Sequence, residues 1–157
     1  MRRVSGFTLI EIVLTVCIMM LVLLLAVPSL NGVLKDRRLR QSLDRFNTLV
    51  SKAREQSITE HRPYLLIVGN KSVEVRPEVI SKDDEPEPVA DLPLSDRDSI
   101  KITFPAAMIK QPPAEWVFWP SGVCEPAIVD YLGRSGLWRV TYSALNAQPE
   151  ITQYAPR

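Results

Sequence analysis

The sequence predicts an α+β fold in which one long N-terminal helix packs against a C-terminal antiparallel β-sheet domain. Three observations predict it: an apolar run near the N-terminus, an apolar stripe at helical spacing after that run, and short β-rich segments separated by Pro and Gly. At 157 residues the chain has room for one modest domain and an extended element. We expect one folding unit, with residues 7–30, 31–62 and 63–157 as its successive parts.

The first of these parts, residues 7–30, has the length and composition of a transmembrane helix. From Ile12 to Val27 every residue is apolar except Thr15. Extended to 7–30, the stretch is long enough to cross the hydrocarbon core of a bilayer. A cleaved secretory signal is the alternative, but Leu25-Ala26-Val27-Pro28 stands where small residues of a signal cleavage site would be expected.

An acidic residue, Glu11, stands at the mouth of this apolar run. A carboxylate at the centre of a bilayer costs roughly 3 kcal/mol on insertion scales, so such a residue normally marks a partner or a function. Glu11 therefore requires an explanation that a simple membrane anchor does not provide.

The segment Arg2-Arg3-Val4-Ser5-Gly6-Phe7-Thr8-Leu9-Ile10-Glu11 resembles the processing site of type IV pilins and of the pseudopilins of type II secretion. The resemblance implies that residues 1–6 form a leader, that a prepilin peptidase cleaves between Gly6 and Phe7, and that Phe7 is then N-methylated. It implies a filament-assembly role for Glu11, the fifth residue after the cut. Pro28 matches the position where the family bends or loosens its helix.

The chemistry of these residues agrees with the resemblance. Gly6 has no side chain, which suits the close backbone approach that a protease needs. Cleavage gives Phe7 a new amino group, and Glu11 lies about one helical turn away. In a filament of packed apolar helices, the Glu11 carboxylate can pair with the amino terminus of a neighbouring subunit and satisfy both charges.

The charges around the membrane segment conflict with the orientation that the resemblance implies. The positive-inside rule weighs Arg2 and Arg3 on one side against Lys35, Arg37, Arg38 and Arg40 on the other, and the second group is larger. Charge alone would place the N-terminus outside. The cleavage motif is the more specific signal, so we expect a cytoplasmic leader, a single pass through the bacterial inner membrane and a periplasmic C-terminal domain.

The second part, residues 31–62, reads as an amphipathic continuation of the helix. We expect an interruption around Pro28 to Gly32 and an end near Arg62, because Pro63 disfavours helical geometry in the residue before it. A narrow apolar stripe recurs at alternating steps of four and three: Leu39, Leu43, Phe46, Val50, Ala53 and Ser57.

The third part, residues 63–157, reads as short strands of an antiparallel sheet packed on the stripe. The acidic, Pro-containing part of residues 77–98 is expected to be a mobile loop, because its composition buries little surface. The expected strands are Tyr64 to Val68, Ser72 to Arg76, Ser99 to Phe104, Trp116 to Trp119, Ala127 to Leu132 and Leu137 to Ser143.

Charge is distributed unevenly along the polar parts. Residues 31–62 contain eight Lys or Arg against four Asp or Glu, whereas residues 63–157 contain nine against thirteen. The net acidity of the C-terminal part argues against nucleic-acid binding through Arg134 and Arg139. The acidic loop lacks the ordered ligand spacing of a calcium loop, and His61 has no second metal ligand at a useful spacing. The cluster Trp116 to Trp119 is interpreted as core packing rather than as a binding platform.

No combination of residues in the sequence indicates an enzyme, a cofactor or a metal site. The chain resembles the H-type minor pseudopilins and their FimT-like fimbrial relatives in three respects. These are its size, its single long helix and its strand-rich C-terminal end, which includes Phe118-Trp119-Pro120-Ser121-Gly122. The first hypothesis is a minor pseudopilin that supports protein export by a type II secretion pseudopilus. The alternatives are a minor type IV pilin in pilus biogenesis or DNA uptake, and a membrane-anchored protein with no filament role. The implied partners are the prepilin peptidase, the major and other minor pseudopilins, the inner-membrane assembly platform and membrane lipid.

Overall fold

The computed structural model describes residues 8–78, 87–105 and 115–157, and of residues 25–31 only the backbone. Within these ranges the chain forms one helix, α1 (Leu9–Thr59), followed by eight strands. The strands are β1 (Tyr64–Val68), β2 (Ser72–Pro77), β3 (Ala90–Pro93), β4 (Ser99–Thr103), β5 (Glu115–Phe118), β6 (Ala127–Gly133), β7 (Gly136–Tyr142) and β8 (Pro149–Pro156).

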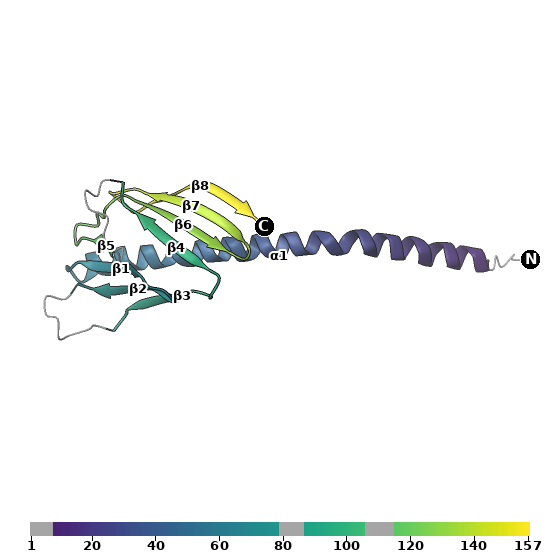
Figure 1. Cartoon of the computed structure of the whole chain (residues 1–157), viewed down its shortest axis with the longest axis horizontal. Helices are drawn as coiled ribbons and strands as arrows, with labels where there is room; N and C mark the ends of the chain where they lie inside the picture. Colours follow the sequence, from purple (N-terminus) through teal and green to yellow (C-terminus); the bar gives the residue numbers. More distant parts are fainter. Residues whose placement is uncertain (1–7, 79–86, 106–114) are drawn as a thin grey trace, which may run out of the picture.

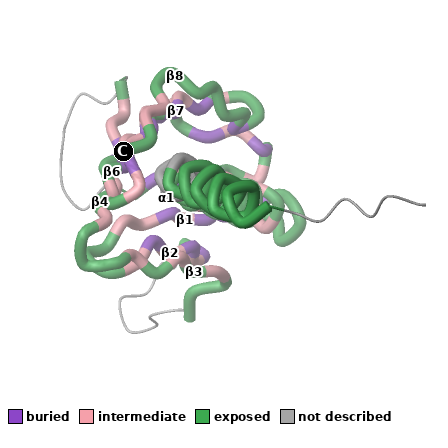
Figure 2. Tube along the Cα trace, turned by 90° about the vertical axis from the view of Figure 1, so that its right-hand side faces the viewer, coloured by how far each residue is buried: buried purple, intermediate pink, exposed green. Residues whose placement is uncertain are grey.

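The strands form two antiparallel four-stranded sheets. One sheet has the order β3-β2-β1-β5 and the other has the order β4-β6-β7-β8. The C-terminal half of α1 lies between the sheets, and the N-terminal half projects beyond them (Figure 1). Figure 2 looks nearly along α1 and shows β7 and β8 on one side of the helix and β2 and β3 on the other. The predicted α+β class is confirmed.

The apolar stripe of the packed half faces the sheets as the sequence predicted. Leu39, Phe46 and Ala53 have no exposed surface, and Leu43, Val50 and Ser57 are also buried. Leu49 is buried too, which widens the apolar face beyond a single narrow line. Because the face is this wide, strands can cover it from two sides, and the chain forms two sheets where one was expected.

Aromatic side chains fill the space between the helix and the strands. The Phe46 ring lies 5.6 Å from the Trp138 ring and 6.1 Å from that of Tyr142, measured between centroids. Trp116 lies 5.1 Å from Tyr142, nearly edge to face. Phe118 is fully buried, whereas Trp119 is 46% exposed. Core packing is therefore confirmed for Trp116 and Phe118 and is wrong for Trp119.

Two strands arise where none was predicted. β3 lies inside residues 77–98, where a loop was expected; the most acidic part of that segment, residues 79–86, is outside the described residues. β8 was also missed. Both are edge strands bounded by proline, and β8 has no buried residue, so backbone pairing rather than an apolar pattern holds them in place.

The course of α1 differs from the expectation at two points. The helix continues through Pro28 to Gly32, where an interruption was expected. Proline removes one backbone hydrogen-bond donor, but its fixed φ is compatible with a helix, so α1 can continue on both sides of Pro28. The bend at Pro28 itself stays a prediction.

The helix ends at Thr59, three residues earlier than Arg62. The Glu60 amide donates to Gln56 O at 2.9 Å, and His61 follows with a φ of 51°. This left-handed residue turns the chain toward Pro63 and β1 before the proline is reached.

Candidate assembly surface

Of the four predicted site residues Gly6, Phe7, Glu11 and Pro28, Glu11 is the one whose side chain the structure describes. Gly6 and Phe7 lie outside the described residues, as does the side chain of Pro28. Glu11 sits in the first turn of α1, where its backbone amide donates to Thr8 O at 3.0 Å. A carboxylate at this end is favoured by the unpaired amides of the helix N-terminus. Its side chain is exposed and makes no ion pair within 4.0 Å to any of the described residues.

The projecting half of α1 is apolar on its whole circumference. Every residue from Leu9 to Leu24 is exposed, with Leu9 at 82% and Leu24 at 75%; Figure 2 shows this half as a green tube in front of the domain. The hydroxyl of Thr15 donates to Ile12 O at 2.8 Å, so its hydrogen bond is made within the helix. An apolar surface of this extent requires a cover that the described strands do not provide. Within the residues that the structure describes, no helix combines the length and the hydropathy needed to cross a membrane.

The packed half of α1 is joined to β7, to β8 and to the turn after β5 by hydrogen bonds that involve buried or half-buried side chains. Each of these bonds connects the helix to a residue at least 62 positions away in the sequence, so together they fix the helix relative to the domain. The donors and acceptors are Tyr154 OH to Asp36 Oδ1 (2.8 Å), Trp138 Nε1 to Ser42 Oγ (2.9 Å), Tyr142 OH to Asn47 Oδ1 (2.6 Å), Arg54 Nε to Gly122 O (2.9 Å) and Ser57 Oγ to Trp119 O (3.1 Å).

Burial changes the titration of the tyrosines in these contacts. Removal from water raises the pKa of Tyr142, which is almost completely buried. Desolvation, followed by the hydrogen bond to Asp36 and its negative charge, raises the pKa of Tyr154. Both hydroxyls therefore remain protonated donors at any physiological pH.

Sequence reasoning missed two of these connecting residues on α1, Ser42 and Asn47. Ser42 and Asn47 flank the apolar stripe, where a polar residue normally faces water. The signal that could have found them is their position beside the stripe: Ser42 immediately precedes Leu43, and Asn47 immediately follows Phe46. Their partners could not have been named, because those lie in strands about 95 residues away.

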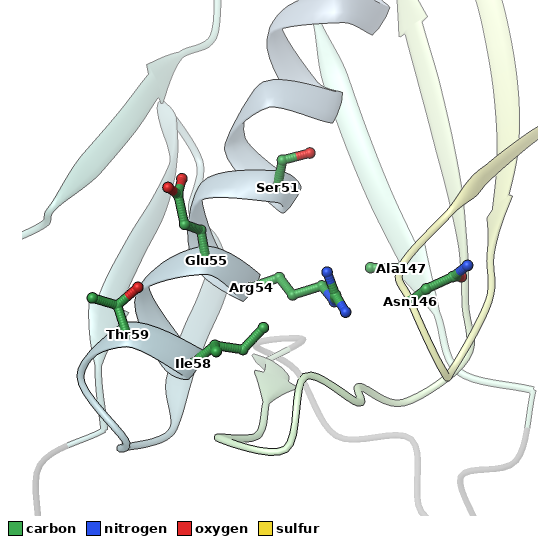
Figure 3. Close-up of a pocket in the computed structure, with 7 residues that line it drawn as sticks. All are labelled: Ser51, Arg54, Glu55, Ile58, Thr59, Asn146 and Ala147. Carbon is green, nitrogen blue, oxygen red and sulfur yellow. The ribbon is translucent and has the colours of Figure 1, made fainter.

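The end of the domain away from the projecting half carries a small pocket of about 230 Å³. Figure 3 shows the Arg54 side chain reaching from α1 toward Asn146 and Ala147, with Ile58 beside it on the same helix. The bond from Arg54 to Gly122 O ties the helix to the turn after β5. Arg54 therefore acts as a structural connection at this end.

The two arginines considered for nucleic acid have different surroundings. Arg139 on β7 is engaged in an ion pair with Asp130 on β6, and Asp130 raises its pKa. Arg134 is exposed in the turn between these strands.

Among the described residues, no group of three His, Cys, Asp or Glu side chains is arranged to hold a metal ion. Cys17 and Cys124 are both free thiols.

No family profile and no curated protein sequence matches this sequence. Two structures of the minor pseudopilin EpsH from the type II secretion system of Vibrio cholerae do match it in three dimensions. One has a TM-score of 0.51 at 12% identity, and the match covers 72% of this chain and 94% of the EpsH chain in that structure. The other has a TM-score of 0.55 at 13% identity and covers 78% and 96%. The chain has the fold of a minor pseudopilin. At these identities the likeness is one of fold, and it spans nearly the whole of the EpsH chain in each of the two structures.

Proposed function

We propose that this protein is a minor pseudopilin that joins a type II secretion pseudopilus and supports protein export across the outer membrane. The observation that carries the proposal is the projecting half of α1: an exposed apolar helix that has Glu11 in its first turn and continues into a domain with the EpsH fold. The role is structural, and the proposal includes no catalytic residue.

Residues 7–30 serve as the membrane anchor in this proposal. Their sequence is apolar apart from a few small or polar residues and Glu11, and it has the length of a bilayer-spanning helix. The prepilin peptidase removes residues 1–6 on the cytoplasmic side, and methylation of Phe7 follows. The domain of residues 63–157 then lies in the periplasm.

Glu11 directs assembly once the leader is removed. Cleavage creates a new amino group at Phe7, four positions before Glu11 in the sequence, and no cation among the described residues forms an ion pair with the Glu11 carboxylate. The amino terminus of a neighbouring subunit supplies one, and the pair sets the axial position of the two helices. Apolar surfaces of the neighbouring helices cover the rest of the projecting half.

Mass spectrometry tests the processing step. Chain purified from a host with the prepilin peptidase should begin at methylated Phe7, whereas chain from a peptidase-deficient host should keep Met1. A Gly6→Ala variant should be cut more slowly, and a bulky residue at position 6 should block the cut. Recovery of an intact Met1 chain in the presence of the peptidase would overturn the proposal.

A secretion assay tests the system to which the chain belongs. Deletion of its gene should reduce export of a type II reporter substrate and leave pilus assembly intact. Loss of pili with normal export would instead identify a minor type IV pilin.

A further inference from the structure

A basic cleft lies at the end of the domain from which the projecting half of α1 emerges. Its volume is about 260 Å³, and its wall includes Arg38 and Arg45 of α1 and Arg134 of the β6–β7 turn. The position of the turn is fixed by its contacts: Gly136 packs against Leu39, and the amide of Arg157 donates to Ser135 O. Figure 1 shows this end of the sheet beside the point where α1 emerges.

The lining of the cleft carries more positive than negative charge, and no ion pair with the described residues neutralises the excess. None of its three arginines forms an ion pair within 4.0 Å with a residue in the described ranges. Asp98 is the one carboxylate of the wall, so the lining carries three cations and one anion. Asp98 lies against Gly133 next to the Tyr131 hydroxyl, and its charge adds to burial in raising the pKa of that tyrosine.

The remaining wall offers hydrogen-bond donors suited to an oxyanion. Ser95 and Ser135 contribute hydroxyl groups to the same wall as the arginines. Arginine presents a planar set of N–H donors that matches a phosphate group in a bidentate way. This combination of donors is typical of a site for a phosphate-bearing ligand rather than for a carbohydrate or an apolar peptide.

The location of the cleft determines which phosphate can reach it. Arg38 follows Leu30 by eight residues, which is about 12 Å along a helix. The headgroup layer occupies about 5 to 8 Å on each side of the hydrocarbon core. Helical side chains point back toward the N-terminus, so the Arg38 guanidinium would lie nearer to the bilayer than its own Cα.

We propose that this cleft binds the phosphate of an anionic lipid headgroup and holds the domain against the membrane surface. The inference rests on the proposed function, because it requires residues 7–30 to be in the membrane. Lys35 lies on the same face of α1, one turn closer to the anchor, and extends the basic surface in that direction. The bound lipid would orient the subunit before it enters the filament.

Binding of short-chain lipid to the full chain in neutral micelles tests the proposal. Dihexanoyl-phosphatidylglycerol should bind, while dihexanoyl-phosphatidylcholine and inorganic phosphate should bind at least tenfold more weakly. Arg38→Gln and Arg134→Gln should each lower the affinity about fivefold, since a basic residue near an anionic surface contributes about that factor. The double variant should lose about 25-fold, and raised salt should weaken binding of the parent chain.

Arg37→Gln is the matched control, because Arg37 is the exposed neighbour of Arg38 and lies outside the cleft wall. Its affinity should change less than twofold. Equal losses in Arg37→Gln and Arg38→Gln would overturn the proposal in favour of diffuse charge attraction. Inorganic phosphate binding as tightly as the lipid, with the same arginine dependence, would also overturn the assignment to lipid.

The experiment separates this inference from the proposed function. It uses purified chain and requires neither the peptidase nor other subunits. A chain that is processed and assembles normally, yet shows no preference for phosphatidylglycerol, would refute the lipid site and leave the pseudopilin proposal standing. A chain that binds lipid through Arg38 and Arg134 but keeps Met1 in the presence of the peptidase would refute the pseudopilin proposal instead.

Discussion

The two halves of α1 belong to one helix but present their apolar side chains in opposite ways. In the packed half, the stripe that includes Leu39, Phe46 and Ala53 is buried by strands of the same chain. In the projecting half, from Leu9 to Leu24, apolar side chains point in every direction and all are exposed. The comparison teaches that an apolar stripe is completed within the molecule, whereas an all-round apolar helix requires cover from outside it.

Polar residues follow the same division. Ser42 and Asn47 of the packed half accept hydrogen bonds from buried aromatic side chains of β7. In the projecting half, the Thr15 hydroxyl makes its hydrogen bond within the helix, to Ile12 O, and Glu11 has no ion pair with a described residue. Polar groups of the packed half thus stabilise the domain, whereas Glu11 is available to another molecule.

A Leu→Asp substitution in each half of α1 should give the largest difference in the stability of the domain. Leu43→Asp buries an unpaired carboxylate between helix and sheets and removes a packed leucine, a loss of more than about 4 kcal/mol in the free energy of unfolding. The domain should lose its near-ultraviolet circular dichroism, which reports on the packed Trp and Tyr side chains. Leu14→Asp is the matched change in the projecting half. It should leave the domain's melting temperature unchanged and release the chain from membranes on carbonate extraction. A Leu43→Asp variant that melts as the parent does would contradict the division.

Removal of the Glu11 carboxylate should affect assembly alone. Glu11→Val leaves a neighbour's amino terminus unpaired in an apolar environment, at a cost of roughly 3 to 5 kcal/mol. Cleavage and membrane insertion should continue, because the peptidase reads the leader and Gly6, and the lost charge makes membrane residence easier. The measurement is crosslinking to the major pseudopilin together with secretion of a reporter substrate. Glu55→Val, which removes an exposed carboxylate of the packed half, should change neither readout. Parental crosslinking and secretion by Glu11→Val would show that this carboxylate is not the assembly contact.

Loss of one connecting side chain should weaken the domain by a smaller amount. Ser42→Ala leaves the buried Trp138 N–H without its acceptor, which costs about 1 to 3 kcal/mol in the free energy of unfolding. Chemical denaturation of the full chain in micelles measures the difference. Thr48→Ala serves as the control, because Thr48 is exposed and bonds only within the helix. Equal stabilities of the two variants would mean that the connection contributes nothing.

Alkaline pH should weaken the packing of the strands on α1 through the tyrosines of those strands. An unfolded tyrosine titrates near pH 10, and burial raises the pKa of Tyr142 in the folded chain. The folded state therefore holds more protons in this range. Stability is fully present below about pH 10 and is lost as pH rises toward the folded value, by up to about 1.4 kcal/mol for the first pH unit.

Tyr142→Phe should reduce the slope of stability against pH above 10. The slope should not vanish, because the pKa values of Tyr64, Tyr131 and Tyr154 are raised as well. Denaturation curves between pH 8 and 11 provide the measurement. An unchanged slope in the variant would show that Tyr142 titrates as freely in the folded chain as in the unfolded one.

Features that depend on local repetition along the chain could be predicted from the residues alone. The step of three and four residues placed Leu39, Phe46 and Val50 on one buried face, and the β-rich segments Tyr64 to Val68 and Ser72 to Arg76 placed β1 and most of β2 where the structure has them. Gly6, Phe7 and Glu11 could be predicted as a processing and assembly motif because such a motif is defined by residue types at fixed spacing along the chain.

The way in which distant residues meet depends on tertiary packing and could not be predicted from local patterns. Periodicity does not say whether a wide apolar face is covered by one sheet or two, so the division into two sheets was not predicted. The edge strands β3 and β8 carry weak patterns, because neighbouring backbone rather than burial holds them. Arg38 and Arg134 share a cleft only because the β6–β7 turn returns to the start of the stripe. Such contacts join residues nearly a hundred positions apart, and the energy that fixes them belongs to the whole packed domain.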